Sequence, residues 1–74
     1  MAHYRGWTIV VSLDSIDEDW SAQATQGLYF NLPQLIQANS QANAQHFILG
    51  EWLATKEEAF AAIISKIDQF IAQG

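Results

Sequence analysis

The sequence predicts a single small α+β domain over residues 1–74, a three-stranded antiparallel sheet with a C-terminal amphipathic helix packed on one face (β-β-β-α). Three observations lead to this fold class. Residues 4–13 alternate with the period of a strand, residues 14–19 form a polar run typical of a turn, and apolar residues after position 56 recur with the period of a helix. A chain of 74 residues without Cys is close to the lower limit for one unstapled domain.

The first predicted strand covers residues 4–13. Its alternation places Trp7, Ile9, Val11 and Leu13 on one face and Tyr4, Thr8, Val10 and Ser12 on the other. The second strand is expected at residues 19–25 and forms a hairpin with the first. We expect the helix to lie on the face made by Trp7, Ile9, Val11, Trp20, Ala22 and Ala24, where the small Ala residues admit a close helix backbone.

Gly27 marks a bend, beyond which residues 28–30 could extend the second strand. Residues 31–45 are expected to be a loop with one or two helical turns. In that helical part Asn31 would be the cap, Pro33 would lie in the first turn, and Leu32, Leu35 and Ile36 would point inward. The third strand is placed at residues 46–54. It would be either covered on both sides or bulged at Gly50.

The last element is a helix over residues 56–72. Thr55 followed by Glu58 matches a capping box. The apolar stripe consists of Ala59, Phe60, Ile63, Ile64, Ile67, Phe70 and Ile71, with Ser65, Lys66, Asp68 and Gln69 on the opposite side. This stripe is what must dock on the sheet.

Charge and composition disfavour several classes of function. The formal charge is -5, and the three cations Arg5, Lys56 and Lys66 are scattered. Nucleic acids and anionic membranes are bound mainly through clustered cations, so neither is an expected partner. No secretory signal or membrane-spanning run is recognised, and a cytoplasmic location is expected. No cofactor is expected.

Few residues suggest chemistry. The cluster of Asp14, Asp17, Glu18 and Asp19 could bind Ca²⁺ or Mg²⁺, but its spacing differs from a calcium loop and a solvated turn is favoured. His3 and His46 are interpreted as surface residues, and no catalytic triad can be assembled. Glu51 is either a carboxylate in a cleft or, as we favour, a charge that protects an edge strand.

A partner surface is predicted on the sheet face turned away from the helix. Tyr4 and Val10, with Tyr29 or Phe47, would lie there and would bind a protein or a second copy of the chain. The favoured hypothesis is therefore a non-enzymatic protein-interaction domain. An antitoxin-like domain that neutralises a basic toxin and an accessory subunit or metal-binding module are the alternatives.

The segment Thr55-Lys56-Glu57-Glu58-Ala59, which opens an amphipathic helix after short strands, resembles the small β-β-β-α domain of HicB-like antitoxins. That family has a Gly-Asp-Thr-x-Glu-Glu-Ala segment, of which Thr55, Glu57, Glu58 and Ala59 match. The family's Gly-Asp pair and its Gly-Cys turn are missing from this chain. The resemblance implies the β-β-β-α topology and a toxin as partner. In overall texture the chain is also similar to small cyanobacterial proteins of unassigned function.

Overall fold

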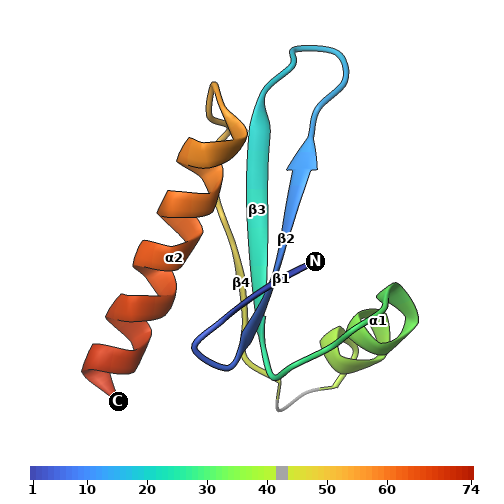
Figure 1. Cartoon of the computed structure of the whole chain (residues 1–74), viewed down its shortest axis with the longest axis vertical. Coiled ribbons are helices and arrows are strands. Elements are labelled where there is room, and N and C mark those ends of the chain that lie inside the picture. The colour runs from blue at the N-terminus through green and yellow to red at the C-terminus, as the bar shows by residue number, and fades with distance from the viewer. Residues whose placement is uncertain (42–43) are drawn as a thin grey trace.

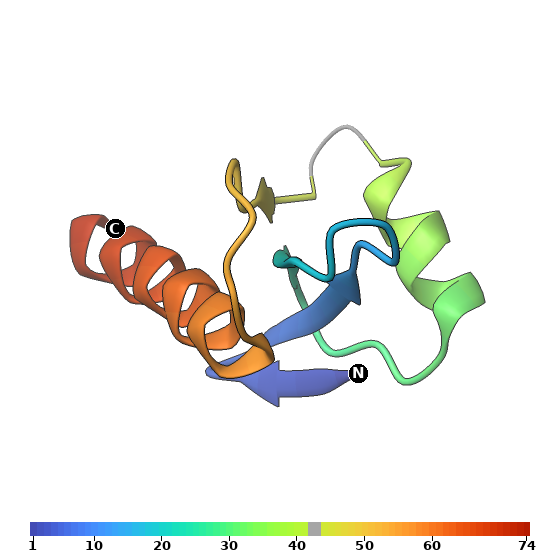
Figure 2. The ribbon, with the colours of Figure 1, turned by 90° about the horizontal axis from the view of Figure 1, so that it is seen from above.

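The computed structural model describes residues 1–41 and 44–74 and shows an antiparallel sheet between two helices (Figures 1 and 2). The elements are β1 (Ala2–Tyr4), β2 (Trp7–Leu13), β3 (Trp20–Gln26), α1 (Leu32–Asn39), β4 (His46–Ile48) and α2 (Lys56–Gln73). The sheet order is β1-β2-β3-β4. The predicted α+β class with a C-terminal helix on an antiparallel sheet is confirmed, but the number of strands was wrong: there are four, not three.

The fourth strand arises because the predicted strand over residues 4–13 is broken by a turn at Arg5 and Gly6. Both residues have positive φ, 49° and 84°, as a two-residue hairpin turn that matches the strand twist requires. Tyr4 and Trp7 are therefore partners across the hairpin and their side chains share a face. In one continuous strand, two residues three apart would lie on opposite faces. Gly6 within the alternating run is the signal for this turn.

Replacing Gly6 with Ala should destabilise the protein by about 1–2 kcal/mol, because a side chain disfavours the left-handed conformation. The space around Gly6 is open, so the cost would come from the backbone alone. Gly50 is the matched control, because its surroundings are equally open and its φ is not positive. Urea unfolding of both Ala variants measures the difference. Equal midpoints for the two variants would contradict the assignment of a left-handed turn.

The turn between β2 and β3, and the bounds of β3, agree with the prediction to within one residue. Leu13 pairs with Trp20, and residues 14–19 make the connection. The Asp14 N–H donates to the Asp19 carbonyl at 2.8 Å, and the Asp14 carboxylate accepts from the Ile16 N–H at 2.9 Å. Short polar side chains of this kind stabilise turns by such local bonds. The acidic run is thus a turn at the tip of the hairpin.

Residues 28–30 do not extend β3, so that prediction was wrong. Gly27 has a φ of 112° and its N–H donates to the Gly6 carbonyl at 2.7 Å. This bend directs the chain over the sheet to α1. Asn31 caps α1 by accepting from the Gln34 N–H, and Pro33 lies in the first turn, as predicted.

The inward side of α1 differs from the prediction. Leu35 and Ala38 are buried, whereas Leu32 and Ile36 are more than half exposed. A helix of two turns touches the sheet along one narrow line, so residues three apart fill that line and their neighbours remain on the flank. The part of the loop prediction that concerns residues 42–43 lies outside the described residues.

The third predicted strand, at residues 46–54, is shorter than expected. Pairing with β3 covers only His46–Ile48, with one further bond from the Leu49 N–H to the Ala22 carbonyl at 2.9 Å. Leu53 then pairs with Trp20 through two bonds of 2.7 Å. Residues 50–52 therefore bulge out between two points of pairing, which is the second of the two predicted alternatives for Gly50.

The helix α2 docks on the sheet as predicted and completes the core. The Thr55 hydroxyl accepts from the Glu58 N–H at 3.1 Å, which confirms the Thr55 half of the predicted capping box. Ala59, Ile63 and Ile67 are fully buried against Trp7, Ile9, Ala22 and Ala24, and Val11 and Trp20 pack at the edge of this core. The ring of Trp7 stacks on Phe47 and meets Phe70 edge-on, with centroid distances of 5.1 and 5.5 Å.

Candidate functional site

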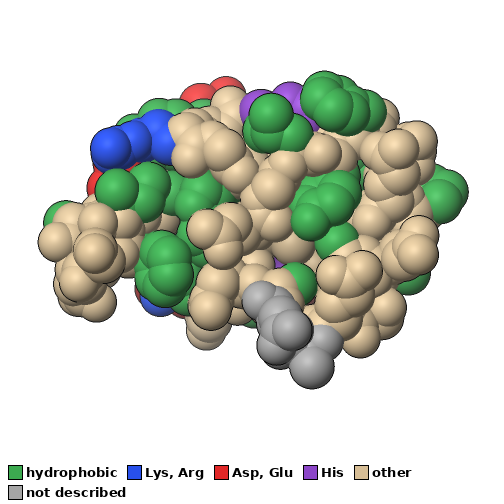
Figure 3. All heavy atoms as spheres, turned by 90° about the horizontal axis from the view of Figure 1, so that it is seen from below, with side chains coloured by type: hydrophobic (Ala, Val, Ile, Leu, Met, Phe, Trp, Pro, Cys, Tyr) green, Lys and Arg blue, Asp and Glu red, His purple; other side chains and the backbone are tan. Residues whose placement is uncertain are grey.

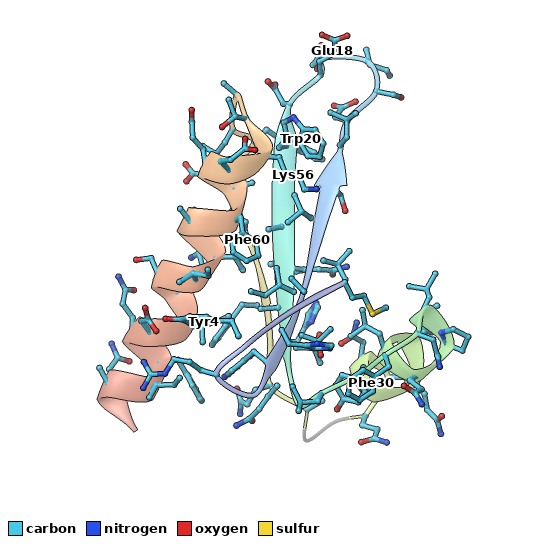
Figure 4. The ribbon with its side chains drawn as sticks, viewed as in Figure 1. Tyr4, Glu18, Trp20, Phe30, Lys56 and Phe60 are labelled. Carbon is cyan, nitrogen blue, oxygen red and sulfur yellow. The ribbon has the colours of Figure 1, made fainter. Side chains whose placement is uncertain are left out.

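Two of the four residues predicted for a partner surface lie on the wrong side of the sheet. Tyr4 points toward α2 (Figure 4), and its hydroxyl donates to the Asp68 carboxylate at 3.0 and 3.1 Å. Arg5 Nη1 contacts the same carboxylate at 3.0 Å. The reversal follows from the turn at Arg5 and Gly6. Asp68 was predicted to lie on the solvent side of its helix. Its carboxylate instead binds Tyr4 and Arg5 and so connects α2 to the first hairpin.

Phe47 also faces α2. It pairs with Ala24, which belongs to the core, so both side chains point to the same side of the sheet. Its ring stacks on Trp7 and meets Phe70 edge-on at 5.4 Å. Residues 47–49 are all apolar, so the sequence alone does not show which of them face α2. The pairing register with β3 determines that Phe47 does.

Val10 and Tyr29 lie on the outer side of the sheet, the side turned away from α2. Val10 pairs with Gln23, which pairs in turn with Ile48. The Tyr29 N–H donates to Thr8 Oγ1 at 2.9 Å, and its hydroxyl donates to the Gln26 carbonyl at 3.2 Å. Tyr29 thus helps to hold the segment that leads into α1, and Val10 lies on the part of the outer side that α1 leaves open.

A row of polar side chains crosses all four strands beneath α1. The register aligns His3, Thr8, Thr25 and His46. Thr8 Oγ1 donates to the Gly27 carbonyl at 2.8 Å. Thr25 Oγ1 lies 2.8 Å from Asn39 Oδ1 and 3.0 Å from His46 Nδ1. Because a hydroxyl has one proton and Asn39 Oδ1 only accepts, His46 Nδ1–H is the donor to Thr25.

This row anchors the outer layer to the sheet. Thr8 holds the segment after Gly27, and Thr25 holds the end of α1 through Asn39. His3 Nε2–H donates to the Tyr29 carbonyl at 2.7 Å, and its ring packs edge-on against Phe30. Both histidines therefore have structural partners. Sequence reasoning missed this row because four residues far apart in the chain come together only through the register.

Charge is distributed unevenly over the molecule. Residues 20–50 contain no Asp, Glu, Lys or Arg, and neither do the outward positions of β1 and β2. We call the outer side of the sheet, together with residues 28–30 and α1, the neutral face. The charged residues lie elsewhere, on the Arg5 turn, the loop 14–19, Glu51 in the bulge, and α2. In Figure 3 the red and blue side chains stay on the α2 side of the view.

The carboxylates gather at one end of the molecule. The loop 14–19 and the start of α2 lie at the same end (Figure 1), where Glu18 and Lys56 are labelled in Figure 4. Asp68, near the other end of α2, is the exception. Within residues 1–41 and 44–74, no group of three or more His, Asp or Glu side chains is arranged to hold a metal ion.

The neutral face carries large apolar side chains in contact with solvent. Each of the following is more than half exposed: Leu28, Phe30, Leu32, Ile36 and Ile48. Trp52, on the bulge beside this face, is exposed to the same degree. Soluble proteins rarely expose large contiguous apolar areas without a function for them. This face is therefore the candidate functional site.

Two hollows lie on the neutral face. One, of about 490 Å³, runs between residues 28–30 and α1 and is lined by Phe30, Gln34 and Gln37 among others. The second, of about 360 Å³, lies on the part of the outer sheet that α1 leaves open and is lined by Ser12, Ser21, Gln23, Ile48 and Trp52 among others. Among the residues that the structure describes, none that lines either hollow is charged. Glu51 is exposed on the bulge, outside the second hollow.

Across the described ranges, neither helix combines the length and the apolar character needed to cross a membrane. Comparison of the chain with protein-family models, with curated proteins and with solved structures finds no match.

Proposed function

We propose that this chain is a non-enzymatic protein-interaction domain that binds a protein partner through the neutral face. One observation carries the proposal: the exposed Phe30, Leu32, Ile36 and Ile48 lie on a side without formal charge, in a chain with three Lys or Arg and eight Asp or Glu elsewhere. The centres of protein interfaces are depleted of charged residues and enriched in aromatic ones. The composition of this face follows that pattern.

The polar groups of the neutral face support a binding role over a catalytic one. The hydroxyls of Thr8 and Thr25 are buried and hold the outer layer in place. His46 Nδ1 is engaged by Thr25. These groups fix α1 on the sheet, so a partner would meet a preformed surface. A preformed surface loses less conformational entropy on binding than a mobile one.

Photo-crosslinking in a native extract tests this function. A benzophenone side chain in place of Leu32, on the exposed flank of α1, should form a covalent adduct with a protein. The same side chain in place of Ser65, on the solvent side of α2, is the matched control and should form none. Adducts of equal yield at both positions, or no protein adduct at position 32, would refute the proposal.

A further inference from the structure

The protein partner of the neutral face can be inferred from its shape and chemistry. We propose that it is a second copy of this chain, related by a two-fold axis, with α1 of each copy lying over the open part of the other copy's outer sheet. This inference rests on the proposed function and names its partner.

The neutral face has a raised part, the helix α1, next to a hollow, so two copies of this face could fit together. The helix α1 stands on the part of the outer sheet near Thr25, where Leu35 and Ala38 are buried. Beyond it lies the open hollow of about 360 Å³ that includes Ile48 and Trp52. A raised helix and a hollow side by side on one surface are what a two-fold interface needs, because each half must fit its own copy.

The chemistry of the two halves also matches. Leu32 and Ile36, on one flank of α1, are apolar and exposed, and so are Ile48 and Trp52 in and beside the hollow. The polar residues that line the two hollows are amides and hydroxyls, such as Gln34 and Gln37 in the first and Gln23 in the second. An amide has both donors and an acceptor, so it can pair with an identical group, whereas a carboxylate cannot.

Electrostatic repulsion between two identical copies is expected to be weakest when they meet through the neutral face. Two molecules of charge -5 repel one another wherever their carboxylates meet. At physiological salt this repulsion fades over about 8 Å. Contact through the neutral face keeps α2 of both copies on the outside, because α2 covers the opposite side of the sheet (Figure 2). The loop 14–19, which adjoins Ser12 and Ser21 at the end of the hollow, would lie at the rim. Glu51, beside Trp52, would lie at the rim, where water still screens it.

The area required is compatible with the size of the chain. A stable specific interface buries about 800 Å² per partner. The accessible surface of this chain is 4861 Å², so a dimer would cover roughly one sixth of it. The neutral face is one of the two broad sides of the molecule, and it is large enough to bury this area. A protein this short also gains stability from the extra apolar burial.

A charge-exchange experiment in sedimentation equilibrium tests the dimer. Ile36→Lys on α1 and Ile48→Glu in the hollow should each weaken self-association at least about tenfold, because each homodimer would bury two charges against apolar partners. An equimolar mixture of the two variants should dimerise again. In the mixed dimer one contact pairs Lys with Glu and the other retains Ile with Ile.

Ser65→Lys on the solvent side of α2 is the control and should leave the association constant unchanged. Both test positions are exposed, so far-UV circular dichroism should show native folding for every variant. A wild-type chain that stays monomeric, or variants that fail to recover association on mixing, would overturn this dimer. If the crosslinker at position 32 then captured a different protein, the interaction function would stand without the dimer; no adduct at all would remove both.

Discussion

Replacing Trp7 with Ala is expected to cost about 3–5 kcal/mol of the free energy of unfolding. The indole is 2% exposed and contacts the rings of both Phe47 and Phe70, which also contact each other. A domain of this length has a total stability of about 4–11 kcal/mol, so the change should remove a large part of it.

Trp52→Ala is the matched control, since the same atoms are removed from a side chain that is 55% exposed. Its cost should stay within about 0.5–1 kcal/mol. Urea unfolding followed by circular dichroism compares the two variants. The protein must be dilute enough to be monomeric, because loss of a partner would itself lower the apparent stability. Similar unfolding midpoints would contradict the central place of Trp7 in the core.

The second large effect is expected when Ala59 is replaced with Leu. Ala59 and Ala24 are fully buried in the same core, where α2 packs mainly across β3. A larger side chain at position 59 would force α2 away from the sheet along its first turns. Overpacking of this kind costs about 1–3 kcal/mol, and the displacement of Ile63 and Ile67 would add to it.

Ala61→Leu provides the comparison on the same helix. Ala61 is exposed, and Ala and Leu differ little in helix propensity, so the change should be within a few tenths of a kcal/mol. Thermal unfolding of the two variants is the measurement. If Ala59→Leu proved as stable as Ala61→Leu, the close approach of α2 to β3 would be wrong.

Elements with strong local signals were predicted well from the sequence. The helix α2 was recognised from its seven-residue apolar stripe and from the Thr55 cap, both of which are read within a few positions. Asn31 and Pro33 identified the start of α1 in the same way. The loop 14–19 followed from the density of residues whose side chains bond to nearby backbone.

The candidate site was predicted less well because it depends on which side of the sheet each residue faces. One turn at Arg5 and Gly6 shifts the alternation and moves Tyr4 from the outer side to α2. The side of Phe47 depends on its register with Ala24, which is set by contacts between segments distant in the chain. Leu32 and Ile36 were expected inside because the narrow contact line of a short helix has no signature in the sequence.

The uneven placement of ionised groups makes this molecule electrically asymmetric, with most of its carboxylates in segments at one end (Figure 1). A positively charged surface, such as an anion-exchange resin, would capture it by the end that holds the hairpin tip and the start of α2. In a captured monomer the uncharged layer around α1 would then face away from the resin. Immobilisation of this kind would orient the monomer without any chemical tag and present its apolar side to a second copy in solution.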